Sequence, residues 1–233
     1  MWKTSQIAKW LTSHNFNFIA YDKFGCGESS GDWKQVSLDT LRDDLAAISD
    51  FIYTQLKAPV IIMGQSEGSI IAPEAANLTN SIKALVLRVA SNQNIRERMK
   101  YQYEKLEWEE DAWKAWNSGI QKIETSHEQR KPITGFLMNY PNTYWLSRLN
   151  RKLTAAHIQE LNIPIFALNG EKDIYTPKDA FEEIHKTLNS HISQKSKAKI
   201  YNDVGHSLSK TNEHWGESEA DKDIIDWLNL LDL

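Results

Sequence analysis

The sequence contains a single cysteine, Cys26, among its 233 residues. One thiol cannot form an internal disulfide or a cysteine metal cage, which agrees with a reducing compartment. The apolar runs are also short, far below the roughly 18 residues that span a bilayer. No charged start followed by an apolar segment and a small-residue cleavage site stands near Met1, so no secretory signal is predicted. We therefore expect a cytoplasmic protein without a membrane span.

Positive charge is not in excess either. Lys and Arg number 27 against 31 Asp and Glu, so the formal net charge is −4. No global basic field exists that would hold nucleic acid or anionic lipid. The composition, 41% hydrophobic and 25% charged, is that of a globular chain, and the length predicts one α/β-sized unit. These numbers disfavour nucleic-acid and membrane partners and leave the oligomeric state open.

Short apolar runs alternate with longer amphipathic segments along the chain, which predicts an α/β fold. The runs show little polar alternation, as is typical of parallel strands covered on both faces. Behind Ser37, a candidate N-cap, apolar residues recur three and four positions apart, which predicts a helix. Strands are expected at residues 16–21, 59–64, 82–90, 164–169 and 197–202, and further helices at 5–13, after 66, at 178–188 and at 221–231. This order predicts a doubly wound, mostly parallel sheet.

Residues 91–157 interrupt the alternation. They are rich in charged and aromatic side chains and contain no run typical of a buried strand, so we predict a helical insertion between the core parts 1–90 and 158–233. Trp108 and Trp116 fall on one helical face, which an inward packing stripe explains; the alternative is the wall of an apolar ligand pocket. On that alternative the candidate substrate contacts are Trp108, Trp113, Trp116, Phe136 and Tyr140.

Residues 64–68 read Gly-Gln-Ser-Glu-Gly and follow a predicted strand directly. The two glycines let the backbone turn sharply and leave room beside Ser66, so its hydroxyl should project at the carboxyl edge of the sheet. A serine hydroxyl becomes a good nucleophile when a positioned base removes its proton. The backbone N–H of Glu67 is the candidate donor to an oxyanion. The Glu67 carboxylate is expected in the first turn of a helix, where the helix dipole stabilises a negative charge and so explains an acidic residue.

The candidate base and its orienting acid follow two later strands. Asp173 comes just after the strand predicted at 164–169, with Glu171 as a nearby rival acid, and His206 comes just after the strand at 197–202. Because the carboxyl ends of parallel strands share one edge, we expect Asp173 and His206 to converge with Ser66 there. The chain order Ser, acid, His is the one expected for this type of sheet.

Four segments, in order, carry a resemblance to a known family: residues 21–31, with the pattern Tyr-Asp-x-x-Gly-x-Gly-x-Ser, residues 63–73 around Ser66, residues 168–173, and residues 205–206. The chain resembles the α/β-hydrolase superfamily, in particular its esterase and serine-aminopeptidase-like branch, from about residue 2 to 233. The resemblance implies Ser66 as nucleophile, His206 as base and Asp173 as its orienting partner. It also implies that residues 91–157 form a cap over an acyl pocket.

The sequence departs from the family at its start. Members begin with further strands, and a His-Gly segment after the third supplies a second oxyanion donor; here that segment is missing, which leaves the N–H of Glu67. Losing one donor costs about a hundred- to a thousandfold in rate. The third strand would lie between those at 16–21 and 59–64. We expect the chain to be an incomplete version of a longer protein; alternatively, these two strands pair directly, or a partner chain supplies the missing strands.

The principal hypothesis is a serine hydrolase that cleaves carboxylic esters, or related acyl compounds, of small-molecule substrates through an acyl-enzyme, with no metal or organic cofactor. One alternative is a catalytically weak or inactive remnant of the fold, or a ligand-binding module. A further alternative is an aminopeptidase-like serine peptidase. Acidic residues would then attract a free amino end, although a solvated helix face explains them more simply. These acids are Glu104, Glu107, Glu109, Glu110 and Asp111.

Overall fold

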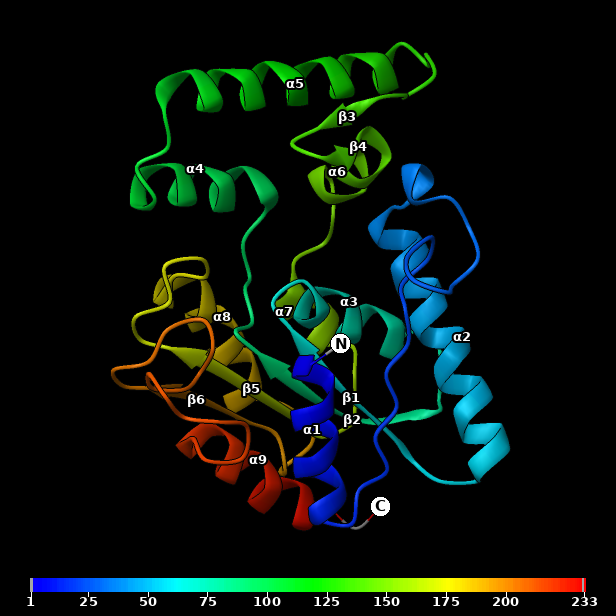
Figure 1. The fold of residues 1–233 in the computed structure, drawn as a ribbon, viewed down its shortest axis with the longest axis vertical. Coiled ribbons are helices and arrows are strands. Elements are labelled where there is room, and N and C mark those ends of the chain that lie inside the picture. Colours follow the sequence, from blue (N-terminus) through cyan, green and yellow to red (C-terminus); the bar gives the residue numbers. More distant parts are fainter. Residues whose placement is uncertain (1, 232) are drawn as a thin grey trace.

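The computed structural model describes residues 2–231 and 233 (Figure 1). Residues 1 and 232, which the predicted core 1–90 and 158–233 includes, lie outside the described residues. In chain order the elements are α1 (Trp2–Ser13), a 3-10 turn (Trp33–Gln35), α2 (Leu38–Leu56), β1 (Val60–Gln65), α3 (Gly68–Ala76), β2 (Ile82–Arg88), α4 (Ile95–Lys105), α5 (Glu110–Glu128), β3 (Phe136–Leu137), β4 (Tyr140–Pro141), α6 (Asn142–Leu149), α7 (Thr154–Ile158), β5 (Ile165–Gly170), α8 (Lys178–Asn189), β6 (Lys197–Tyr201) and α9 (Glu219–Asn229).

Four parallel strands form the main sheet in the order β1-β2-β5-β6. The central strand β5 is buried at every position, whereas the edge strand β1 is buried only at Val60 and Gly64. Four of the strands expected from the apolar runs are thus present, as is the helix behind Ser37, whose hydroxyl accepts the N–H of Thr40 at 3.0 Å. The prediction of a mostly parallel α/β sheet is confirmed.

Helices cover both faces of this sheet (Figure 1). On one face, α3, α7 and α8 bury small and branched apolar side chains such as Ala72, Ile158 and Ile184. On the other face, α1 and α9 bury larger side chains, among them Trp10 and Trp227. Among the described residues, no helix has the length and apolar character needed to cross a bilayer.

The strand expected at residues 16–21 is absent. The segment is extended, and Phe16 and Phe18 pack partly against the cluster under α1 and α9, but Ile19 and Tyr21 are 51% and 40% exposed. It forms no ladder with β1 or any other strand in the described part of the chain. A strand needs a neighbour that accepts its backbone hydrogen bonds. The expectation of a strand here was therefore wrong, and so was the alternative in which it pairs directly with β1.

Residues 91–157 hold the helices α4 to α7 and a short β3–β4 hairpin that the sequence did not suggest. In Figure 1, α4, α5 and α6 lie together at the end of the molecule away from α9. They share a separate buried cluster, in which Trp116 and Ile120 of α5 pack with Leu38 and Leu41 of α2. The helical character of the segment is confirmed, while its status as a domain stays a prediction.

Candidate active site

Ser66 lies in the turn between β1 and α3 with a positive φ of 54°. A residue other than glycine adopts this left-handed conformation at a cost, and such strain occurs mostly at functional sites. The turn is held from both sides, because the N–H of Ser66 donates to the carbonyl of Arg88 at 3.0 Å and its own carbonyl accepts the hydroxyl of Ser69 at 2.6 Å. Strand and helix together therefore keep the serine in this conformation.

The two glycines around Ser66 differ in what the structure requires of them. A Cβ on Gly64 would lie 2.3 Å from the carbonyl oxygen of Gly68, so only glycine lets β1 and α3 approach this closely. A Cβ on Gly68 would meet nothing within 4 Å. The structure thus requires a glycine at position 64 for the close approach of β1 and α3, and makes no such requirement at position 68.

Asp173 follows β5 and lies in a loop that is tied to the end of β6. The N–H of Glu171 donates to the carbonyl of Tyr201 at 2.9 Å, and that of Lys172 donates to the carbonyl of Val204 at the same distance. The carboxylate of Asp173 is fully buried; its Oδ1 accepts the backbone N–H groups of two residues further on in the loop, at 2.8 and 3.1 Å. These bonds orient Oδ2 toward the loop after β6.

His206 lies in that second loop, and its Nδ1 is 2.8 Å from Oδ2 of Asp173. The imidazole is 27% exposed, and the ring of Tyr175 meets it edge-on at 5.1 Å. Because Nδ1 faces the carboxylate, Nε2 is the nitrogen left for a substrate or a hydroxyl. Glu171, the rival acid, is exposed and accepts the N–H of Asp203 instead. The structure thus brings His206 together with Asp173.

Arg88, the last residue of β2, forms a hydrogen bond with the loop that carries His206. Its guanidinium is 2% exposed, donates to the carbonyl of Ser207 at 3.0 Å and pairs with Asp221 of α9 at 2.6 Å. A buried pair of this kind contributes little net stability, but removing one partner leaves an uncompensated charge. Arg88 therefore couples the fold of α9 to the position of the histidine loop.

Asp221→Asn is expected to lower the free energy of unfolding by about 3–5 kcal/mol, because it strands the buried charge of Arg88. Urea denaturation followed by circular dichroism measures this. The matched control is Asp226→Asn, which makes the same charge change at an exposed site of α9 and should cost at most about 0.5 kcal/mol. Equal midpoints for the two variants would contradict the assignment.

The carboxylate of Glu67 has a different role from the expected one. It lies 3.1 Å from Nζ of Lys23 and 3.3 Å from Nη1 of Arg148, and it accepts the hydroxyl of Tyr144. Burial alone would raise the pKa of Glu67, but Lys23, the Tyr144 hydroxyl and Arg148 together hold it below its usual value. Glu67 thus connects the loop before α2 with helix α6. These contacts are additional to any interaction of its carboxylate with the helix dipole.

Arg98 of α4 lies beside Ser66, a contact that the sequence did not predict. Its Nη2 lies 3.4 Å from Oγ of Ser66, and its side chain is buried, with the whole residue 8% exposed. No hydrogen bond joins Ser66 to His206 within residues 2–231 and 233. No motif marks Arg98; the available signal was a charged residue in the first turns of a helix directly after a central strand.

The five aromatic candidates lie in the insertion. Trp116 is 1% exposed and stacks on Trp113 at 5.4 Å, and Trp108 joins the same cluster. Phe136 is 51% exposed; Tyr140, at 37%, stacks on Tyr144. None of the five has a hydrogen bond or ring contact with Ser66, Asp173 or His206 in the described part of the chain. Their role in substrate binding stays a prediction.

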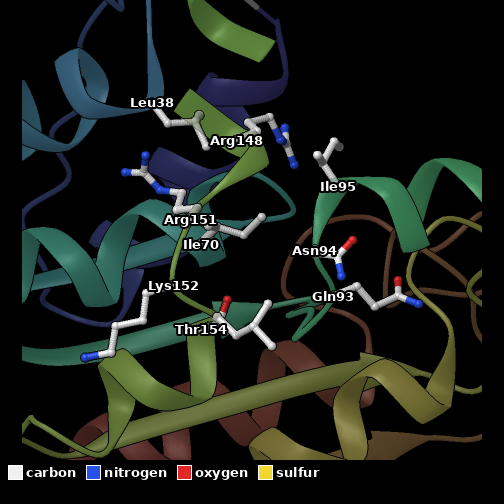
Figure 2. A pocket seen from close by; sticks show the side chains of 10 residues that line it. Leu38, Ile70, Gln93, Asn94, Ile95, Arg148, Arg151, Lys152 and Thr154 are labelled. Atoms are coloured by element: carbon white, nitrogen blue, oxygen red, sulfur yellow. The ribbon is translucent and has the colours of Figure 1, made fainter. Parts of the chain in front are cut away.

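A small pocket lies between α3, α4 and the segment from α6 to α7 (Figure 2). In Figure 2, Arg148 extends toward Ile95, whereas Arg151 and Lys152 point to the other side. Through Arg148 the pocket adjoins the Glu67 contacts, but Ser66, Asp173 and His206 do not line it. No group of three or more side chains suited to holding a metal occurs among the described residues.

Two family models match successive parts of the chain. Residues 1–132, more than half of the chain, match the family described as serine aminopeptidase, S33, and residues 125–232 match the dienelactone hydrolase family. The chain belongs to the α/β-hydrolase superfamily. Both models describe hydrolases, so this superfamily member is a hydrolase. No curated protein sequence matches it.

Solved structures agree on the fold. A monoacylglycerol lipase of Paleococcus ferrophilus is 17% identical, with a TM-score of 0.60 over 95% of this chain and 86% of that one. An esterase of Pyrococcus furiosus is 16% identical, with a TM-score of 0.64 over 97% and 74%. An esterase of Exiguobacterium antarcticum is 14% identical, with a TM-score of 0.57 over 97% and 85%. At these identities the similarity supports the α/β-hydrolase fold. It does not identify the substrate of this chain.

Proposed function

We propose that this α/β-hydrolase cleaves carboxylic esters through an acyl-enzyme, with Ser66 as nucleophile, His206 as base and Asp173 as its orienting partner. The observation that carries the proposal is the 2.8 Å contact between Asp173 and His206, two residues from separate loops. These loops follow the carboxyl ends of β5 and β6, and Ser66 follows the carboxyl end of β1 in the same sheet, in a strained turn. This combination is what a serine hydrolase needs.

In the proposed reaction, Ser66 Oγ bonds to the ester carbonyl carbon while His206 accepts the hydroxyl proton at Nε2. Asp173 holds Nδ1–H and stabilises the imidazolium. The proton then passes to the departing alcohol, the C–O bond breaks, and water releases the acid by the reverse path. In the resting molecule the Ser66 hydroxyl lies near Arg98 rather than His206. The hydrogen bond between a nucleophile and its base often forms fully only when substrate binds.

The same resting contact supports a second candidate function, ligand binding without turnover. If Ser66 stays on Arg98, its hydroxyl is never deprotonated by His206. The peptidase alternative gains no such support, because its acidic residues are all exposed, at the end of α4, in the connection to α5 and at the start of α5. These residues are Glu104, Glu107, Glu109, Glu110 and Asp111.

A fluorophosphonate probe separates hydrolysis from binding alone. We expect it to label the wild-type chain once, on the peptide that contains Ser66, and to abolish hydrolysis of p-nitrophenyl butyrate in step with labelling. The Ser66→Ala variant should take up no probe. A wild-type chain that neither reacts with the probe nor hydrolyses the ester would favour the binding module instead.

A further inference from the structure

Arg98 is a buried cation without an ion-pair partner. It is 8% exposed, and no carboxylate oxygen lies within 4.0 Å of its guanidinium in the described part of the chain. The other buried arginine, Arg88, differs, since it pairs with Asp221, and the half-buried Arg151 pairs with Glu74. Burial, together with the nearby charge of Arg148, lowers the pKa of Arg98 to about 10, so it remains charged at neutral pH. A buried charge left unpaired is costly and indicates a functional role.

The guanidinium points at the reacting atom. Its Nη2 is 3.4 Å from Oγ of Ser66, beyond the usual range of about 2.7–3.2 Å, so its bond to the neutral hydroxyl is weak. In the tetrahedral intermediate the negative oxygen is bonded to the same carbon as Oγ. The two oxygens are therefore neighbours, and we expect a charged hydrogen bond from the guanidinium to this oxygen to close to about 2.7–2.9 Å. The interaction thus strengthens when charge develops.

We propose that Arg98 is a catalytic residue that stabilises the oxyanion of the tetrahedral intermediate, together with the backbone N–H of Glu67. This inference rests on the proposed ester hydrolysis. As Ser66 Oγ bonds to the carbonyl carbon, the π pair of the C=O bond moves onto the oxygen, where Nη2–H of Arg98 donates to it. When the C=O bond re-forms and the alcohol leaves, the interaction weakens again. Binding that is strongest in the intermediate lowers the barrier.

The neighbouring cations do not compete for this role. Arg148 and Lys23 are both held by Glu67, at 3.3 and 3.1 Å. Arg98 itself is held by its helix, because a capping box fixes the start of α4: Asn94 Oδ1 accepts the N–H of Glu97 at 3.0 Å, and Glu97 accepts the N–H of Asn94. A charge placed in advance in a buried site is effective because it needs no reorganisation during the reaction.

The experiment compares Arg98→Gln and Arg98→Lys with wild type, on p-nitrophenyl hexanoate and on the p-nitrophenyl monoester of adipic acid. Arg98→Gln should lower kcat about a hundred- to a thousandfold with little change in KM, equally for both esters. Arg98→Lys keeps a charge and should lose less. The affinity for phenylboronic acid, whose adduct with Ser66 carries a negative oxygen, should fall with kcat. The control Lys100→Gln removes an exposed charge from the same helix and should change none of these values.

The outcomes separate this inference from the proposed function. If the wild type hydrolyses both esters through Ser66 but Arg98→Gln stays within about threefold in kcat, only the role of Arg98 is overturned. A loss confined to the adipate ester also overturns it, since Arg98 would then bind a carboxylate of the substrate. If the wild type has no Ser66-dependent activity, both proposals fail. Should circular dichroism show Arg98→Gln unfolded, Arg98→Lys is measured on both esters and phenylboronic acid instead, and values within about threefold of wild type would then overturn the role of Arg98.

Discussion

On the proposed mechanism, Ser66→Ala is expected to lower kcat for ester hydrolysis about a millionfold, because the variant lacks the hydroxyl on which the acyl-enzyme forms. KM should change little, since the methyl side chain leaves the substrate-binding surfaces in place. Residual turnover would reflect direct attack by water on the bound ester, helped by substrate binding and oxyanion stabilisation. Steady-state kinetics on p-nitrophenyl butyrate, with the variant purified apart from any wild-type enzyme, measures the loss.

Ser69→Ala is the matched control for this result. Ser69 lies in the same turn, but its hydroxyl is buried and donates to the carbonyl of Ser66 instead of facing substrate. We expect this variant to remain active and somewhat less stable. If both serine variants lose activity alike, the effect comes from the turn, and Ser66 is not the nucleophile.

Asp173→Asn is expected to lower kcat about ten-thousandfold, with the fold intact. Asparagine has the same shape, and its carbonyl oxygen can still accept the two backbone N–H groups that Oδ1 accepts now. Its NH₂ group would then face Nδ1 of His206, which forces the proton onto Nε2. The imidazole would hold the wrong tautomer and could not accept the proton of Ser66.

Glu171→Gln makes the same change of charge two residues earlier, on the exposed rival acid. It should leave kcat close to that of wild type, because Glu171 contacts the backbone of Asp203 and not the imidazole. Kinetics of both variants under the conditions used for Ser66→Ala make the comparison. A large loss of kcat in Glu171→Gln together with a small loss in Asp173→Asn would make Glu171, and not Asp173, the acid that orients His206.

Much of the fold was predictable because local chemistry set it. Ser37 caps α2 through its own hydroxyl, and the buried strands β2 and β5 are apolar at residues 84–87 and 165–168 because helices cover both of their faces. Since the strands are parallel, residues directly after them meet at one edge. The candidates Ser66, Asp173 and His206 follow from this rule, and the structure brings the last two into contact.

The sequence alone determined the α/β architecture, the helical character of residues 91–157 and the positions of three candidate reactive groups, because these depend on periodicity and on strand ends. Tertiary structure decided that residues 16–21 pair with no described strand, that Glu67 holds Lys23 and Arg148, and that Arg98 reaches Ser66. Such contacts join residues tens of positions apart and leave no periodic trace. The packing of α4, α6 and the loop before α2 beside the turn at Ser66 brings these residues together.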